Sequence, residues 1–198
     1  MTRLAALAMA AYLLGSLPSA FIVVRLARGT DLRTAKSGNV GALNAFRVTG
    51  SGWIGLAVLT LDVGKGILAV VLAGAGAGLA TQSLVATLAV AGHNWPLWLG
   101  GRGGKGLATA AGALTLVTPL SLPVWSVVWA LGYVASGYIA LGTILATALL
   151  PILLGVLAGW AYALAALPAC LLILGRHREK VRLLLLGQEP KHYWRGGA

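Results

Sequence analysis

The feature that most constrains this chain is the stretch from residue 106 to residue 175, which contains no Asp, Glu, Lys, Arg or His. Charge-free apolar stretches of this kind are typical of transmembrane helices, each of which needs about 20 residues to cross the hydrocarbon core. The stretch is too long for two such helices and fits four short ones. Turn-prone residues divide it at 119–123, 132–137 and 151–159. Pro151 and Pro168 can equally lie inside helices, because neighbouring membrane helices tolerate proline kinks.

Three further apolar segments lie at 4–24, 53–74 and 79–99. Charged residues make up 10% of the chain and the mean hydropathy is +0.88, whereas soluble domains carry about 25% charged residues. Lipid is therefore the expected environment. The start of the chain resembles a signal peptide, but its apolar run continues to Val24, which predicts an uncleaved first helix.

The basic residues predict the orientation of these helices. They gather in three segments, at 25–50, 100–105 and 176–195, and the positive-inside rule places such segments in the cytoplasm. An even number of helices must then separate the second segment from the third, and four satisfies both this parity and the length. We expect one all-α, polytopic transmembrane domain over 1–198, with about seven helices, the N-terminus outside and the C-terminus cytoplasmic. Five helices with re-entrant segments are the alternative.

The net charge of +11 bears on the partners of the chain. A basic balance can indicate nucleic acid, but these charges lie in short loops between apolar segments. They indicate membrane orientation and anionic lipid or phosphate partners instead, so we expect membrane lipids as partners and no nucleic acid. The single Cys170 cannot form an internal disulfide, and no metal-ligand spacing surrounds it. We expect neither a metal nor a cofactor.

Asp62 and Lys65 are the ionisable residues near the middle of an apolar segment. They are three residues apart, so on a helix they share a face. Ionisable groups at this depth face the bundle or a cavity. The pattern favours a structural ion pair over a direct catalytic role. A small membrane transporter remains an alternative function that such charges would suit.

The charged loops carry the candidate chemistry. The segment Ser37–Ala42 is rich in small residues, which let backbone N–H groups approach an anion closely. A second loop surrounds Lys105 with four glycines and resembles a phosphate cradle. It is not a Walker A loop, because Gly106 follows Lys105 where Ser or Thr is required and no strand is predicted before it. His93 alone indicates a structural, hydrogen-bonded histidine. In the tail, His177 and Lys180 share a face if the last helix continues.

Together, these loops resemble the motifs of the PlsY family of bacterial acyl-phosphate:glycerol-3-phosphate acyltransferases. The first loop matches through Asp31-Leu32-Arg33 and through Ser37-Gly38-Asn39 to Arg47. The helix pattern matches through Leu61-Asp62 and Lys65-Gly66, and the second motif through Gly92 to Thr109. The third motif matches through His177-Arg178-Glu179, Arg182-Leu183-Leu184 and Glu189 with Lys191. The resemblance spans nearly the whole chain.

The resemblance implies a seven-helix enzyme of the bacterial inner membrane, a monomer, with its active site on the cytoplasmic face. Such an enzyme transfers a fatty acyl chain from acyl-phosphate to the 1-hydroxyl of glycerol-3-phosphate, giving lysophosphatidic acid and phosphate, and uses no cofactor. It implies that Ser37, Gly38 and Asn39 contact the acyl-phosphate. The residues implied to hold glycerol-3-phosphate or to shape its pocket are Arg47, Gly103, Gly104, Lys105, Gly106, Thr143, His177 and Lys180.

Some motif positions depart from the family pattern. Lys180 stands where the family has Asn, Leu43 replaces Thr, and Ala140 and Thr143 lie where the family carries Ser. A relative with altered or lost activity is therefore the alternative within the family. Because an acyl-phosphate is a mixed anhydride, no covalent nucleophile is required. We expect direct attack by the glycerol hydroxyl, aided by Lys105, with His177, Glu179 or a substrate phosphate oxygen accepting the proton.

Overall fold

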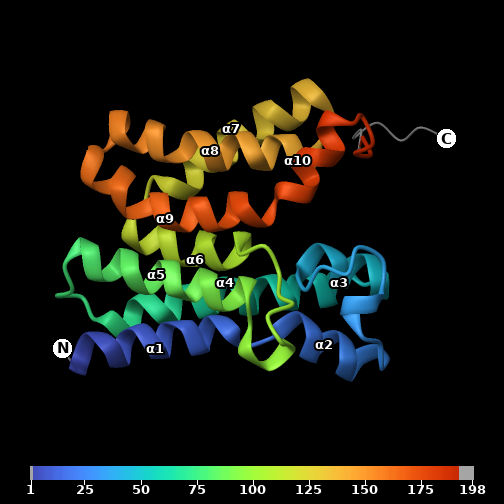
Figure 1. The fold of residues 1–198 in the computed structure, drawn as a ribbon, viewed down its shortest axis with the longest axis horizontal. Helices are drawn as coiled ribbons and strands as arrows, with labels where there is room; N and C mark the ends of the chain where they lie inside the picture. The colour runs from blue at the N-terminus through green and yellow to red at the C-terminus, as the bar shows by residue number, and fades with distance from the viewer. Residues whose placement is uncertain (1, 192–198) are drawn as a thin grey trace. The chain divides into compact units, whose positions relative to one another are not determined.

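The computed structural model describes residues 2–191, and all regular structure within them is helical (Figure 1). The described helices fall into two units, Met1–Val117 and Thr118–Ala198. The first unit contains α1 (Thr2–Ser16), α2 (Ser19–Arg28), η1 (Leu32–Thr34), α3 (Ala42–Thr49), α4 (Gly52–Ala73), α5 (Leu79–Asn94), η2 (Leu97–Leu99) and α6 (Leu107–Val117). The second contains α7 (Ser121–Ser136), α8 (Ile139–Leu157), α9 (Trp160–Arg176) and α10 (Arg178–Leu185).

Glycines allow the long helices of the first unit to pack backbone against backbone. A Cβ added at Gly15 of α1 would overlap the carbonyl of Ala89 in α5, and one at Gly112 of α6 would overlap the carbonyl of Val63 in α4. In lipid there is little hydrophobic force between helices, so close approach of small residues is a main source of their association. These contacts fix α5 beside α1 and α6 beside α4, with the loops of the site at their ends.

The first apolar segment is interrupted, whereas the sequence predicted one helix over 4–24. Helix α1 ends at Ser16 and α2 begins at Ser19, with Leu17 and Pro18 between them. Proline has no N–H to donate, so the helical hydrogen-bond ladder cannot pass through Pro18 unbroken. Residues Arg3–Arg28 still form one apolar stretch long enough to cross a membrane. The interruption leaves the carbonyl of Leu17 to accept a hydrogen bond from Lys65 of α4.

The charge-free stretch contains four helices, as its length predicted: α6, α7, α8 and α9. Their boundaries fall near the turn-prone residues, while Pro151 and Pro168 lie inside α8 and α9. In the second unit Trp125 of α7 donates a hydrogen bond to the hydroxyl of Thr147 in α8 at 3.1 Å. The last apolar helix does not continue straight into the tail, because α9 and α10 meet at an angle of 55° around His177.

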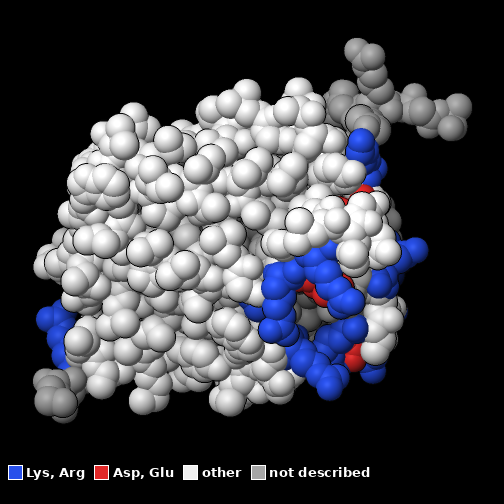
Figure 2. Space-filling model, turned by 45° about the horizontal axis from the view of Figure 1, so that its top comes forward, with Lys and Arg blue, Asp and Glu red and all other residues white. Residues whose placement is uncertain are grey.

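Within residues 2–191, three helical stretches are long and apolar enough to cross a membrane, or four if the bent pair α9–α10 counts as one span. Large apolar side chains such as Leu26, Trp53 and Val134 are exposed on the helices. In the face drawn in Figure 2, the surface away from the loops is almost entirely without charge. An exposed apolar surface of this extent fits lipid as the surrounding solvent.

Candidate active site

The first loop is held in shape by a pair formed between Asp31 and Arg33. The Asp31 carboxylate accepts the backbone N–H of Arg33 at 2.9 Å and caps the short η1 helix. The Arg33 guanidinium donates to both carboxylate oxygens, at 2.7 Å for the nearest pair of atoms. These hydrogen bonds from Arg33 lower the pKa of Asp31 to about 2. The charges of Asp31 and Arg33 neutralise each other, so this pair shapes the loop. The other cations of the loop are left to attract anions.

Asn44 of α3 is the internal scaffold of the same loop. Its side chain is buried, accepts the N–H of Ser37 at 3.3 Å, and donates to the carbonyls of Leu32 and Ala35 at 3.3 and 3.2 Å. One amide thus satisfies three backbone groups of the loop, which has little regular structure beyond η1. The chain passes Gly38 with a φ of 66°, where a Cβ would contact the carbonyl of Arg33.

The predicted acyl-phosphate residues lie on the exposed side of this loop. Ser37 is exposed, and Gly38 and Asn39 are half-buried. Arg47 is exposed in the last turn of α3, which follows the loop directly. The lysine and arginine side chains drawn in Figure 2 are gathered in patches, and large parts of the visible face carry none. The first loop therefore presents small residues and a cation to the surroundings.

The second loop folds back over the end of α5. The N–H of Gly104 donates to the carbonyl of His93 at 3.1 Å. Gly103 lies so close to the carbonyls of His93 and Asn94 and to the ring of Pro96 that a Cβ there would overlap them. Gly106 has a φ of 80° and faces the side chain of Asn94. Glycine is thus favoured at 103 by the close approach of the backbone and at 106 by the positive φ.

The two loops meet at Gly104. A Cβ at this residue would contact the carbonyl of Val40 on one side and the His93 ring on the other. Lys105 follows directly and is half-buried, and α6 begins two residues later, at Leu107. A lysine beside backbone N–H groups at a helix N-terminus is a suitable environment for a phosphate. The structure therefore brings Ser37–Asn39 and Gly103–Gly106 into one region of the first unit.

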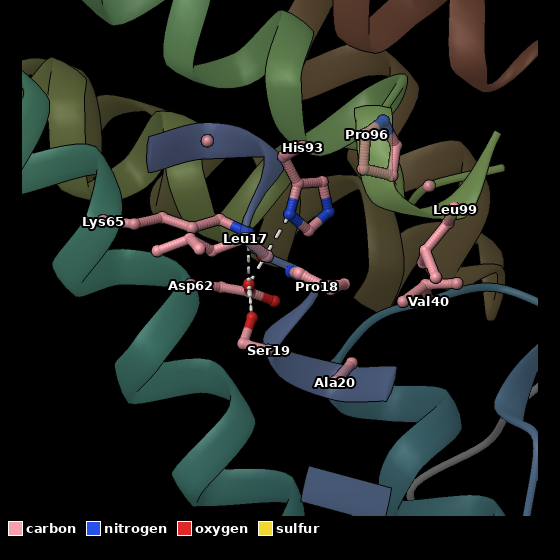
Figure 3. Close-up of a pocket in the computed structure, with 12 residues that line it drawn as sticks. Leu17, Pro18, Ser19, Ala20, Val40, Asp62, Lys65, His93, Pro96 and Leu99 are labelled. Atoms are coloured by element: carbon pink, nitrogen blue, oxygen red, sulfur yellow. Dashed lines mark hydrogen bonds and ion pairs between the residues drawn. The ribbon is translucent and has the colours of Figure 1, made fainter. Parts of the chain in front are cut away.

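A buried polar cluster lies next to this region, at the interruption between α1 and α2 (Figure 3). The Asp62 carboxylate is 2.8 Å from the Lys65 amine and accepts a 2.5 Å hydrogen bond from the hydroxyl of Ser19. The same oxygen of Asp62 lies 3.5 Å from Nδ1 of His93. The expectation of an internal Asp62–Lys65 ion pair is confirmed. The cluster borders a small pocket that Val40, Leu99 and Gly103 also line.

The second unit carries the remaining predicted residues. Thr143 is buried on α8, where its hydroxyl donates to the carbonyl of Ile139 at 2.9 Å. Glu179 is exposed in the first turn of α10. His177 is buried at the junction of α9 and α10, and its Nδ1 lies 2.8 Å from the carbonyl of Ile173. Because a carbonyl only accepts, Nδ1 carries the hydrogen, and Nε2 is the nitrogen that can accept a proton in the neutral ring.

Lys180 contacts the end of the described chain. Its amine donates to both carboxylate oxygens of Glu189, each at 2.8 Å. Gly187 makes this possible, because the chain reverses there at a φ of 66° and the N–H groups of Gln188 and Glu189 return to the carbonyl of Leu183. The side chain predicted to hold substrate is therefore paired with a buried carboxylate of the same unit.

The sequence did not identify the supporting residues Asn44 and Ser19. Neither residue was assigned a contact or a role from the sequence. A buried amide that satisfies three loop groups has no local sequence signal, because its partners lie seven to twelve residues away. The partner of Ser19 is 43 residues away. Only the packed helices reveal both roles.

Comparison with known proteins gives a consistent result. The family model described as "Glycerol-3-phosphate acyltransferase" matches residues 5–187. A protein of Moorella thermoacetica named "Glycerol-3-phosphate acyltransferase 2" is 42% identical over 182 residues, covering 91% of this chain and 93% of that protein. A glycerol-3-phosphate acyltransferase of Desulforudis audaxviator is 36% identical, covering 93% of each chain.

Two solved structures agree in fold. Both are crystal structures of PlsY, described as an integral membrane glycerol 3-phosphate acyltransferase. The glycerol 3-phosphate form has a TM-score of 0.86, 34% identity and 96% coverage of each chain. The lysophosphatidic acid form has a TM-score of 0.83 and 32% identity, covering 96% of this chain and 95% of that one. The predicted all-α, polytopic membrane architecture is confirmed.

Proposed function

The chain belongs to the glycerol-3-phosphate acyltransferase family, and on that premise we propose that it transfers a fatty acyl group from acyl-phosphate to the 1-hydroxyl of glycerol-3-phosphate. The products are lysophosphatidic acid and inorganic phosphate. The observation that supports the proposal is the meeting of the two loops, where Gly104, next to Lys105, lies against the carbonyl of Val40, which follows Ser37–Asn39. Two anionic substrates need such donors to offset their mutual repulsion.

In the proposed reaction the 1-hydroxyl oxygen attacks the carbonyl carbon of the acyl-phosphate. A C–O ester bond forms, the C–O bond to phosphate breaks, and the phosphate leaves with the electron pair. The hydroxyl proton passes to Nε2 of His177, to Glu179 or to a phosphate oxygen. The hydrogen of His177 Nδ1 is directed at the carbonyl of Ile173, and this orientation supports Nε2 as the acceptor or as a donor to phosphate.

The residues of the site have the following proposed roles. Ser37, Gly38 and Asn39 contact the acyl-phosphate head. Arg47 and Lys105 bind the phosphate of glycerol-3-phosphate, with Gly103, Gly104 and Gly106 giving the backbone room to approach it. In the second unit, His177, Lys180 and Thr143 contribute to binding glycerol-3-phosphate. Holding both substrates in an attack geometry can supply much of the rate enhancement without a covalent intermediate.

We also propose the location of the site. The basic loops support a cytoplasmic face, an outside N-terminus and a cytoplasmic C-terminus in a bacterial inner membrane. The apolar helix surfaces give a fatty acyl chain direct access from the bilayer. A monomer is sufficient for this mechanism, since every proposed residue belongs to one chain.

The test is to incubate the purified protein in lipid with palmitoyl-phosphate and glycerol-3-phosphate, and to follow phosphate and lysophosphatidic acid together. Equal amounts of both products are expected. Phosphate without lysophosphatidic acid would indicate hydrolysis of the donor only. Neither product from a folded protein that binds acyl-phosphate would favour the relative with altered or lost activity. Replacing acyl-phosphate with acyl-CoA tests the choice of donor, and no turnover is expected with it.

A further inference from the structure

The buried cluster of Asp62, Lys65, His93 and Ser19 has no place in the proposed mechanism. Asp62 is 1% exposed, and Lys65 and His93 are each 7% exposed. Burying a carboxylate and an amine is costly even when they pair, and well-packed apolar residues are often at least as stable. A polar cluster at this depth of a membrane helix therefore suggests a purpose beyond holding the helices together.

Two residues fix the position of the Asp62 carboxylate, one from α4 and one from α2. Lys65 approaches from one turn along α4, and its amine also donates to the carbonyl of Leu17 at 3.1 Å. Ser19 approaches from the first turn of α2. The carboxylate is thus anchored to both sides of the interruption at Pro18, as Figure 3 shows. A carboxylate held in this way can fix the orientation of a neighbouring imidazole ring.

That ring is His93, which connects the cluster to the glycine loop. Its Nδ1 faces Asp62 at 3.5 Å. The Nε2 and Cε1 atoms of the same ring lie against Gly104, where a Cβ would overlap them, and the His93 carbonyl accepts the Gly104 N–H. Gly104 is the residue at which the two loops meet, and Lys105 follows it. A rotation of the ring would therefore displace the loop that carries Lys105.

We propose that Asp62 is a positioning residue that acts through His93. It holds the imidazole in one orientation, and the ring and backbone of His93 then seat Gly103 and Gly104 so that Lys105 meets the phosphate of glycerol-3-phosphate. This inference rests on the proposed function. Lys65 and Ser19 keep the carboxylate in place. In metal sites, mutating the residues that orient the ligands lowers affinity or activity by about 10–100-fold, and we expect an effect toward the lower end of that range here.

The test compares steady-state constants of Asp62→Asn, His93→Gln and the double variant in lipid. Asp62→Asn keeps the shape of the side chain but removes the charge that orients His93. We expect the KM for glycerol-3-phosphate to rise about tenfold, with kcat changing less than about threefold. A role in folding alone would lower the active fraction and leave KM unchanged. Binding of glycerol-3-phosphate, measured by calorimetry, should weaken by the same factor as KM rises.

The double variant separates a shared pathway from two independent effects. Because Asp62 acts through His93, the double variant should have a KM no higher than the worse single variant, rather than the product of the two increases. Val85→Ala is the matched control, because Val85 is fully buried in α5 two turns before His93. It should lower thermal stability and leave KM unchanged.

The outcomes are distinct. Two results with an active wild type would overturn the positioning role and leave the proposed function intact. One is a normal KM in Asp62→Asn, and the other is a double variant whose KM increase equals the product of the two single increases. A wild type that neither turns over nor binds glycerol-3-phosphate would overturn both. If Asp62→Asn does not fold, Ser19→Ala takes its place in the cycle, since it loosens the carboxylate without leaving a buried charge unpaired. The proposal would also be overturned if Ser19→Ala left KM unchanged, or if its KM increase and that of His93→Gln multiplied in the double variant.

Discussion

The Lys180 amine donates hydrogen bonds to both carboxylate oxygens of Glu189, each at 2.8 Å. The Glu189 side chain is 6% exposed and that of Lys180 is 32% exposed. The pair ties the segment after Gly187 to α10. It also explains how a lysine is accommodated at a motif position where a neutral side chain was expected, because the neighbouring carboxylate neutralises it.

The first prediction concerns this pair. Lys180→Asn should lower the free energy of unfolding by about 1–3 kcal/mol, because it leaves the buried Glu189 carboxylate without its cation. Adding Glu189→Gln should restore most of the loss, since the second change removes that carboxylate. Thermal unfolding of the two variants in detergent measures this. An equally unstable double variant would show that the pair contributes through packing rather than charge.

Lys105 is predicted to be essential for turnover. Lys105→Ala should lower kcat/KM by about 10²–10³, the usual effect of removing a group that stabilises developing charge. Lys105→Arg should retain part of the activity, because it keeps the charge but not the compact amine. The control is Arg102→Ala, which removes an exposed cation from the same loop and should leave kcat/KM within about threefold. Equal losses in both alanine variants would indicate general attraction of anions by the loop.

The Asp31–Arg33 pair predicts a pH range for the first loop. The pKa of Asp31 is lowered from 3.8 to about 2 by its hydrogen bonds from Arg33. The stability this pair contributes is therefore present at and above pH 4 and is lost as the pH falls from about 4 through 2. The chain has only two aspartates, so ¹³C labelling of Asp carboxyls and comparison with Asp31→Asn identifies the resonance. A titration midpoint near 3.8 would contradict the paired geometry in solution.

The proposed orientation predicts which loops a membrane-impermeant reagent can reach. Cys170 is buried, and Cys170→Ala provides a cysteine-free background. Thr34→Cys, in the first loop, should react with an impermeant maleimide in inside-out vesicles and not in intact spheroplasts. Ala75→Cys, between α4 and α5, should show the opposite pattern. If the labelling pattern were reversed at both positions, the topology would be the opposite of the one proposed. Identical labelling at both positions would contradict a membrane crossing by α4 between them.

The sequence by itself determined the lipid environment, the helical class and the family of this protein. The charge-free stretch 106–175 predicts four helices from its length and from the even number of spans that the positive-inside rule requires between two cytoplasmic segments. The glycines around Lys105 predict a phosphate cradle, because small residues let backbone N–H groups approach an anion closely. The Asp62–Lys65 pair follows from a spacing of three on one helix.

Only the tertiary structure decided which distant groups meet. The sequence predicted one continuous helix over 4–24, whereas the structure interrupts it at Leu17 and Pro18. The hydrogen bond from Lys65 to the carbonyl of Leu17 depends on α4 lying beside this interruption. Three other contacts also depend on tertiary packing. They are the contact of His93 with Gly104, the three hydrogen bonds of Asn44 and the chain reversal that brings Glu189 to Lys180. Local propensities act over a few residues, whereas these contacts arise when helices pack, so no sequence pattern within one segment encodes them.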